Sequence, residues 1–301
     1  MARDDGDGGS RPRRGRWVRR LVIYLVLIPV LVLAGLWTAG YFLQGSMIYP
    51  RSFAGAPQIE GPPLRDAEVW WIDTEDGERV EAWWMPAVQK LTKGPMPVVV
   101  FFHGNGELIE HSLDLARFYL ALEMHVAFLE YRGYGRSGGE PSQDAIVRDA
   151  RALVERIAAT RNADASRLVF HGRSLGGGVA AALSERVTPR AMVLESTFTS
   201  MTSMTARYFL PGFLCTNPYR TDAALRKFGG PVLILHGERD SIVPVSHAHA
   251  LGNCGSGCKV VTADADHNDL GSDWKWYTTT IAEFLRDAGV IEFTVPPHKQ
   301  P

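Results

Sequence analysis

The stretch from 168 to 187 reads LVFHGRSLGGGVAAALSERV and holds a serine in a setting that could make it a nucleophile. Ser174 stands at the centre of a G-x-S-x-G pentapeptide that begins at Gly172 and ends at Gly176. A β-prone apolar run precedes the pentapeptide, and an Ala-rich helical pattern follows it. Strand, tight turn and helix in this order hold such a serine on a strained turn with its hydroxyl exposed. A side chain on either glycine would collide with the neighbouring strand or helix, so the glycines favour the same interpretation.

The pentapeptide alone could arise by chance in a chain with 30 glycines, so its partners matter. A serine hydroxyl is a poor nucleophile unless a base removes its proton, and the base must be held by an acid. Asp240 follows one predicted strand and His267 follows the next. The order serine, acid, histidine is that of α/β-hydrolases. Rival acids remain close by, and they are Glu238, Asp264 and Asp266.

Acyl transfer also requires amide donors aimed at the developing oxyanion. The backbone amide of Leu175, directly after the serine, is the first predicted donor. The second should come from the glycine-rich turn after the strand that ends at residue 102. Asn105 is our choice there, with Gly104 and Gly106 as alternatives, although such a turn can also be simple punctuation between elements.

Buried apolar runs alternate with helical patterns through most of the chain. The predicted strands cover residues 98–102, 126–130, 168–170, 191–194, 231–235 and 259–262, preceded by an aromatic hairpin over 68–85. This alternation predicts an α/β fold with a mostly parallel central sheet and helices on both faces. Reactive groups in such sheets collect at the carboxyl ends of the strands, where Ser174, Asp240 and His267 all stand. Residues 199–227 are less regular and are expected to form a short cap over the site.

The N-terminal part has a different character from the body. Residues 1–20 carry seven arginines and three aspartates and are expected to form a disordered basic arm. Residues 21–43 contain no charged side chain, and a segment of this length is long enough for a helix that spans a bilayer. A cleaved signal peptide would have a shorter apolar region, so we predict an uncleaved signal anchor. Residues 44–63 then form a connector, 64–290 the main domain and 291–301 a flexible tail.

Charge and cysteine content narrow the surroundings of the protein. The basic flank of the anchor should stay cytoplasmic, which places the main domain on the extracytoplasmic side. The net charge of the 301-residue chain is −1, and seven arginines and three aspartates give residues 1–20 a charge of +4. The body therefore carries −1 − 4 = −5, and this mildly acidic charge does not suggest nucleic-acid binding. Cys254 and Cys258 flank a glycine-rich turn and could form a disulfide in an oxidising compartment, with two free thiols as the equal alternative. No metal or organic cofactor is suggested.

The stretches HGNGE, EYRGYGRSGG, GRSLGGG, ESTFTSM, LHGERDSIVP and DHNDL resemble, in matching order, the signature blocks of one α/β-hydrolase branch. This branch comprises membrane-anchored serine hydrolases related to the serine aminopeptidase type, monoacylglycerol and lysophospholipid lipases, and protein depalmitoylases. The resemblance covers residues 69–285 and implies that Ser174 is the nucleophile, Asp240 the acid and His267 the base. Two positions depart from the family pattern, since Glu130 stands where Asp is usual and Thr197 where Pro is common. In the same pattern, the loop residues Arg132 and Tyr134 have a structural role.

The expected activity is therefore hydrolysis of carboxylic esters or thioesters by a membrane-anchored serine hydrolase. The anchor and the apolar cap favour hydrophobic or acyl-lipid substrates. Peptide or amide cleavage by the same three side chains is an alternative, and a non-catalytic, membrane-tethered binding protein on a hydrolase scaffold is another.

Overall fold

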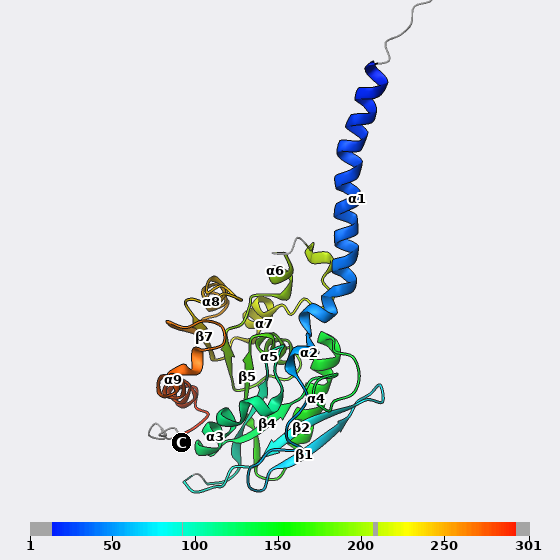
Figure 1. Cartoon of the computed structure of the whole chain (residues 1–301). Coiled ribbons are helices and arrows are strands. Elements are labelled where there is room, and N and C mark those ends of the chain that lie inside the picture. The colour runs from blue at the N-terminus through cyan, green and yellow to red at the C-terminus, as the bar shows by residue number, and fades with distance from the viewer. Residues whose placement is uncertain (1–13, 92, 207–209, 293–301) are drawn as a thin grey trace, which may run out of the picture. The chain divides into compact units, whose positions relative to one another are not determined.

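The chain divides into two compact units, residues 1–43 and residues 44–301. A computed structural model describes residues 14–91, 93–206 and 210–292. Figure 1 shows the helices and strands with the labels used below.

Helix α1 (Arg14–Ile48) supplies the first unit and continues into the second. An apolar stretch that starts at Trp17 is long enough to cross a membrane and has a mean hydropathy of 2.5. The expected disordered arm differs from the structure over residues 14–20, which are helical, and its first 13 residues lie outside the described part. Arginine is a good helix former, and extending an existing helix costs far less than starting one.

The second unit is built on one eight-stranded sheet in the order β1-β2-β4-β3-β5-β6-β7-β8. The strands are β1 (Glu68–Asp73), β2 (Arg79–Met85), β3 (Met96–Phe102), β4 (His125–Leu129), β5 (Ala163–Arg173), β6 (Ala191–Glu195), β7 (Val232–Gly237) and β8 (Cys258–Ala263). The pairs β1–β2 and β2–β4 are antiparallel, and every other pair is parallel. The predicted α/β fold with a mostly parallel sheet is confirmed.

Helices cover both faces of this sheet (Figure 1). They are α2 (Arg51–Ala54), α3 (Leu113–Ala121), α4 (Gln143–Ala158), α5 (Leu175–Ser184), α6 (Met201–Ala206), α7 (Thr221–Phe228), α8 (Ser246–Gly252) and α9 (Trp274–Asp287), with short 3₁₀ turns η1 (Ile109–Ser112), η2 (Gly212–Leu214) and η3 (Leu270–Ser272). Because successive side chains of a strand point to opposite faces, β3 feeds two cores. Val98 and Val100 pack with residues of α4, α5, α7 and α8, whereas Val99 and Phe101 pack with residues of α3 and α9.

Three boundaries differ from the sequence-based expectation. Strand β5 runs up to the residue before Ser174, so the pentapeptide begins inside the strand. Residues 221–227 were expected in the less regular cap, but they lie in helix α7, whose Ala224 and Leu225 are buried. Ile291 was expected in the flexible tail and is only 3% exposed, while residues 293–301 of that tail lie outside the described part. In each case a packed neighbour that no local pattern reveals extends the ordered structure.

The expected connector at 44–63 is partly a buried part of the body. Gln44 is 4% exposed, although it directly follows the apolar stretch. Its side-chain amide donates to the carbonyl of Leu214 (2.9 Å) and accepts from the backbone amide of Thr216 (2.8 Å). One glutamine thus pairs with two backbone groups of the cap.

Tyr49 makes a second buried link to the same cap loop. Its hydroxyl lies 2.8 Å from that of Tyr219 and donates to Asn217 Oδ1 at 3.1 Å. Gln143, at the start of α4, closes the arrangement because its backbone amide donates to Asn217 (2.6 Å) and its side chain accepts from the amide of Tyr219 (2.7 Å). We call Gln44, Tyr49 and their partners on residues 214–219 the juxtamembrane latch.

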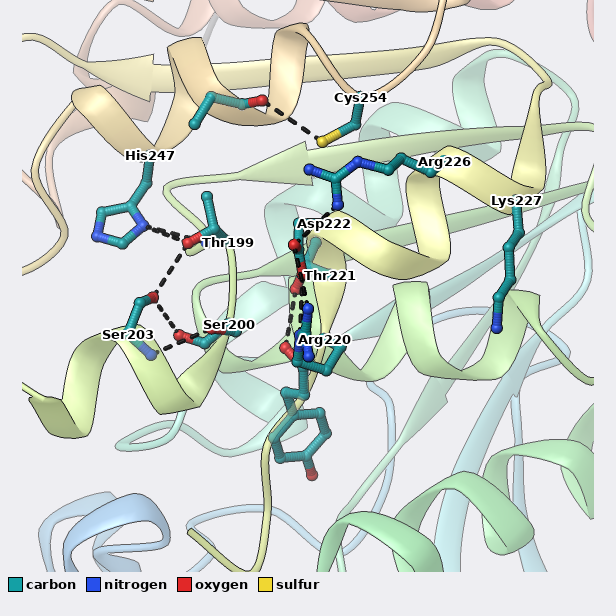
Figure 2. A network of polar contacts seen from close by, with 12 residues as sticks. Thr199, Ser200, Ser203, Arg220, Thr221, Asp222, Arg226, Lys227, His247 and Cys254 are labelled. Atoms are coloured by element: carbon teal, nitrogen blue, oxygen red, sulfur yellow. Dashed lines mark hydrogen bonds and ion pairs between the residues drawn. The ribbon is translucent and has the colours of Figure 1, made fainter. Parts of the chain in front are cut away.

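The first residues of the cap segment are joined to α8 by a polar network that Figure 2 shows from close by. His247 Nδ1 accepts from the backbone amide of Thr199 (3.1 Å) and lies 3.0 Å from the Thr199 hydroxyl. That hydroxyl also contacts Ser203 Oγ (3.0 Å) in α6, while the carbonyl of Thr199 accepts from the amide of Asp222 (2.9 Å) in α7. The point where the chain leaves β6 for the cap is therefore held by contacts with three helices, α6, α7 and α8.

All three cysteines are free thiols. Cys254 and Cys258, in the turn after α8, therefore do not form the disulfide that the sequence left open. Cys254 is buried and donates to the carbonyl of Ala250 (3.4 Å), and burial raises the pKa of both Cys254 and Cys258.

Candidate active site

Ser174 occupies the sharp turn between β5 and α5. Its φ of +52° is a backbone conformation that L residues with side chains rarely adopt. Three hydrogen bonds hold the backbone of this strained residue. Its amide donates to the carbonyl of Glu195 (2.8 Å), and its carbonyl accepts from the Thr197 hydroxyl (2.7 Å) and from the amide of Gly177 (3.0 Å). A non-glycine residue in this region persists only when its surroundings over-determine it, and such residues cluster at functional sites.

The glycines around the serine allow the strand and helix to approach closely. A Cβ on Gly172 would overlap the carbonyl of Gly176, and one on Gly176 would overlap the carbonyl of Phe102 on β3. Gly178 lies against the side chains of Phe198 and Tyr219, where an added Cβ would be 3.1 Å from either. The close contacts expected from the pentapeptide are therefore present, and the extra glycine also makes room for the juxtamembrane latch.

Ser174, His267 and Asp240 form one chain of hydrogen bonds. His267 Nε2 lies 3.0 Å from Ser174 Oγ, and His267 Nδ1 lies 2.8 Å from Asp240 Oδ2. An ionised carboxylate can only accept, so Nδ1 carries the proton and Nε2 is left to accept from the serine hydroxyl. The side chains of His267 and Asp240 are 7% and 0% exposed, which keeps water from competing for these contacts.

Asp240 is held as a carboxylate by several donors. Oδ1 accepts from the backbone amides of Ile242 (2.9 Å) and Val243 (2.7 Å), and Oδ2 faces His236 Nε2 at 3.2 Å. Burial alone would raise the pKa of Asp240, but hydrogen bonds from His236, His267 and Val243 outweigh it and hold the pKa well below its usual range. The contact of His236 with Asp240 was not predicted from the sequence, because it depends on the shape of the loop after β7.

The rival acids do not face the imidazole. Asp266 accepts from the backbone amide of His267 (2.7 Å) and from that of Ser241 (2.8 Å), so it shapes the turn instead of holding the ring. Glu238 accepts from the Thr262 hydroxyl at 2.9 Å. Asp264 is paired with Arg239 at the surface.

The predicted oxyanion donors stand on the two expected turns. Leu175 begins α5, where the first amides of a helix have no partner within the helix. In the turn after β3, the amide of Gly104 already donates to Glu107 Oε2 (2.9 Å), which leaves the amides of Asn105 and Gly106 unpaired within the described residues. The carbonyl of Asn105 is fixed by the Tyr134 hydroxyl (2.7 Å). Oxyanion binding by Leu175 and Asn105 stays a prediction.

Glu130 and Thr197, the two departures from the family pattern, both make hydrogen bonds to the backbone of neighbouring segments. Glu130 Oε2 accepts from the amide of Ile109 (3.2 Å), and Oε1 lies 3.1 Å from His103 Nε2 in a buried pair. Thr197 holds the carbonyl of Ser174. Arg132, expected to be structural, is buried between Asp149 and Asp76 and pairs with both.

Sequence reasoning missed a cluster of charges beside the serine. Arg173 faces Glu107, in the turn after β3, and Glu195, the last residue of β6. Glu195 also accepts from the Tyr277 hydroxyl (2.8 Å). Burial alone would raise the pKa of Glu195, but His171 and Arg173 outweigh it and lower the pKa. The available signal was that all three charged residues lie at strand ends within the quoted motif blocks.

Among the described residues, no group of three or more His, Cys, Asp or Glu side chains could hold a metal ion.

Comparison with known proteins places this geometry in a family. Residues 93–215 match the family described as Serine aminopeptidase, S33. The chain is 34% identical over 200 residues to the α/β hydrolase domain-containing protein WAV2 of Arabidopsis thaliana, covering 60% of this chain and 64% of WAV2. It is 32% identical over 265 residues to protein bem46 of Schizosaccharomyces pombe, covering 82% of this chain and 87% of bem46.

The chain belongs to the α/β-hydrolase superfamily. A solved structure agrees on the fold, since the esterase Pf2001 of Pyrococcus furiosus superposes with a TM-score of 0.61 at 20% identity over 75% of this chain and 98% of that one. The resemblance inferred from the motif blocks is therefore confirmed at the level of the α/β-hydrolase superfamily, and the protein is a hydrolase by family.

Proposed function

We propose that this α/β-hydrolase is a membrane-anchored serine hydrolase that cleaves carboxylic esters or thioesters through an acyl-enzyme. The observation that carries the proposal is the hydrogen-bonded chain from Ser174 through His267 to Asp240, at 3.0 Å and 2.8 Å, on a strained turn. The three residues come from the ends of three different strands, and this is the arrangement that nucleophilic acyl transfer requires.

The steps follow from the proton positions. Ser174 Oγ attacks the acyl carbonyl while its proton moves to His267 Nε2, and the Asp240 carboxylate stabilises the imidazolium. The carbonyl oxygen becomes an oxyanion beside the amides of Leu175 and Asn105. His267 then returns the proton to the leaving alcohol or thiol, and the acyl group stays on Ser174. Water activated by the same imidazole releases the acid and restores the serine.

Support for a hydrophobic substrate comes from the N-terminal helix. The apolar stretch of α1 fits a membrane anchor, and the buried Gln44 links the chain that follows it to the cap. An enzyme tethered in this way meets lipids at high local concentration. We therefore propose acyl lipids or other hydrophobic esters as substrates, with the N-terminus cytoplasmic and the catalytic body on the extracytoplasmic side.

A fluorophosphonate probe tests the central claim. The full-length protein in detergent should be labelled, and Ser174→Ala should not be, with equal folding shown by thermal unfolding. Labelled wild type with a blank variant assigns Ser174 as the nucleophile. Folded wild type that never reacts would favour a non-catalytic binding protein on this scaffold.

A second candidate, cleavage of an amide or peptide bond, is favoured by the description of the matching family as a serine aminopeptidase. The same three side chains serve both reactions, so substrates must decide between them. A panel of p-nitrophenyl esters of graded length, monoacylglycerols and aminoacyl amides compares kcat/KM directly. Preference for long-chain esters supports the proposal, whereas preference for aminoacyl amides supports the alternative.

A further inference from the structure

Arg173, the residue before the serine, directs its three guanidinium nitrogens at three different elements. Nη1 pairs with Glu107 Oε1 (2.5 Å) in the turn after β3, and Nε lies 3.6 Å from Glu195 Oε1 at the end of β6. Nη2 donates to the side-chain oxygen of Asn268 (3.1 Å), the neighbour of His267. One hydrogen bond and two ion pairs from a single planar guanidinium therefore join three segments of the chain.

Each partner reaches a different part of the site. Glu107 uses its second oxygen to accept from the amide of Gly104 (2.9 Å), so the carboxylate bridges Arg173 and the turn that carries Asn105. Glu195 accepts, through its backbone carbonyl, from the amide of Ser174 (2.8 Å). Asn268 follows the base in sequence. One side chain is therefore connected to the proposed oxyanion turn, the nucleophile and the loop of the base.

The charge balance argues that Arg173 is occupied by the protein itself. Its side chain is 23% exposed, and two carboxylates and one amide oxygen surround the three nitrogens. Burial alone would lower the pKa of Arg173, but the charges of Glu195 and Glu107 outweigh it and raise the pKa. A guanidinium already neutralised by two carboxylates is poorly suited to bind an anionic substrate.

We propose that Arg173 is a positioning residue that holds the oxyanion turn, the nucleophile and the base loop in register for the transition state. The proposal rests on the serine-hydrolase function above and adds a residue that does not itself touch substrate. Because the contacts orient groups that act on the developing oxyanion, losing them should raise the barrier to reaction more than it weakens ground-state binding.

The experiment compares Arg173→Gln with wild type in the full-length protein in detergent, using a short p-nitrophenyl ester. We expect kcat to fall about 10- to 100-fold, as for a small misplacement of catalytic groups, with KM changed less than about threefold. The Ki of a trifluoromethyl ketone, which forms the tetrahedral oxyanion on the serine, should rise by a similar factor. The Ki of the corresponding alcohol, which forms no adduct, should stay within about threefold.

Arg167→Gln is the matched control. Arg167 lies in the first half of the same strand, away from the serine, is 22% exposed and pairs with Asp164 at 2.7 Å. Its loss should leave kcat within about twofold of wild type. Arg173→Lys keeps the charge without the fork and should recover little of the lost kcat, because a single ammonium cannot face three elements.

Glu107→Gln and the double variant with Arg173→Gln separate the loss of this linkage from general damage to the fold. The side-chain amide that replaces the Glu107 carboxylate can still accept from Gly104 but cannot form the ion pair. If both substitutions act by breaking the same ion pair, the double variant should lose less kcat than the product of the two single losses. A folded Arg173→Gln protein with wild-type kcat, full rescue by Lys, or equal loss in the Ki of ketone and alcohol would each overturn the positioning role. An inactive, unlabelled wild type would instead overturn the proposed function.

Discussion

At the scale of single residues, the site depends on backbone contacts as much as on side chains. Ser174 adopts a strained φ of +52°, and bonds from its amide to Glu195 and from Thr197 to its carbonyl keep it there. The family pattern often has Pro at the position of Thr197, which has no hydroxyl to donate. The Thr197 hydroxyl therefore supplies a hydrogen bond to the carbonyl of Ser174 that a proline at this position would lack.

Asp240→Asn should lower kcat by about 10⁴-fold while the protein stays folded. The amide would offer a donor to His267 Nδ1 and so favour the wrong tautomer of the imidazole. Steady-state kinetics with a p-nitrophenyl ester measures the effect. Asp264→Asn is the control, since Asp264 is exposed and pairs with Arg239, and its kcat should match wild type. A strong loss in the control with little loss at Asp240 would reassign the acid.

The depressed pKa of Asp240 also predicts a pH dependence of stability. A carboxyl whose pKa is lower in the folded than in the unfolded protein stabilises the fold above its unfolded pKa, about 3.9, and this contribution is lost as pH falls through the folded value. The difference in unfolding free energy between wild type and Asp240→Asn should be constant above about pH 5 and shrink towards pH 3. Chemical unfolding at several pH values measures it, and a difference that grows on acidification contradicts the pKa direction.

At the scale of elements, the segment that leaves the apolar helix is part of the catalytic body. Gln44 and Tyr49 are buried and bond to the cap loop at 214–219, which in turn lies against Gly178 of α5 through Tyr219. The juxtamembrane latch therefore connects the chain after the apolar stretch to helix α5, which begins directly after Ser174. We infer that the cap and the end of α1 are stabilised together.

Gln44→Ala should destabilise the body by about 1 to 3 kcal/mol, because the carbonyl of Leu214 and the amide of Thr216 lose their part-buried hydrogen bonds to the buried glutamine. Thermal unfolding of the full-length protein in detergent measures the loss. Gln89→Ala removes one hydrogen bond to Gly94 at an exposed site and should change stability by less than about 0.5 kcal/mol. Equal, small effects of both substitutions would show that the latch adds nothing to stability.

At the scale of the whole molecule, a hydrolase body follows an apolar helix with a basic N-terminal flank. Four arginines stand between residues 14 and 20, ahead of the uncharged stretch. The excess of basic residues near a membrane helix stays on the cytoplasmic side, so the body should face away from the cytoplasm.

Protease added to intact spheroplasts that express the protein should therefore digest the body and spare a tag at the N-terminus. A cytoplasmic marker protein must survive the same treatment, and detergent must expose the tag. Full protection of the body from external protease contradicts the proposed topology, although it leaves the hydrolase fold and the site untouched.

The sequence alone determined the features that depend on neighbours along the chain. The elbow around Ser174 was predictable because strand, glycine turn and helix are consecutive. The strand ends that carry Asp240 and His267 were predictable because buried apolar runs stop at them. Since parallel strands present their carboxyl ends at one edge of a sheet, residues that follow such strands are brought towards that edge before any coordinate is known.

Only the tertiary structure decided which of these groups meet. The order β5-β6-β7-β8 brings the loops of Asp240 and His267 beside the serine, and the bend after β7 turns Asp240 towards the ring while Asp266 caps a turn. The motif blocks place Arg173 and its acidic partners on neighbouring strands, but the individual contacts of Arg173 and the burial of Gln44 were not predictable, because they join residues 22 to 172 positions apart with no periodic pattern. Side-chain contacts over such separations are set by packing, which a local pattern of residues does not encode.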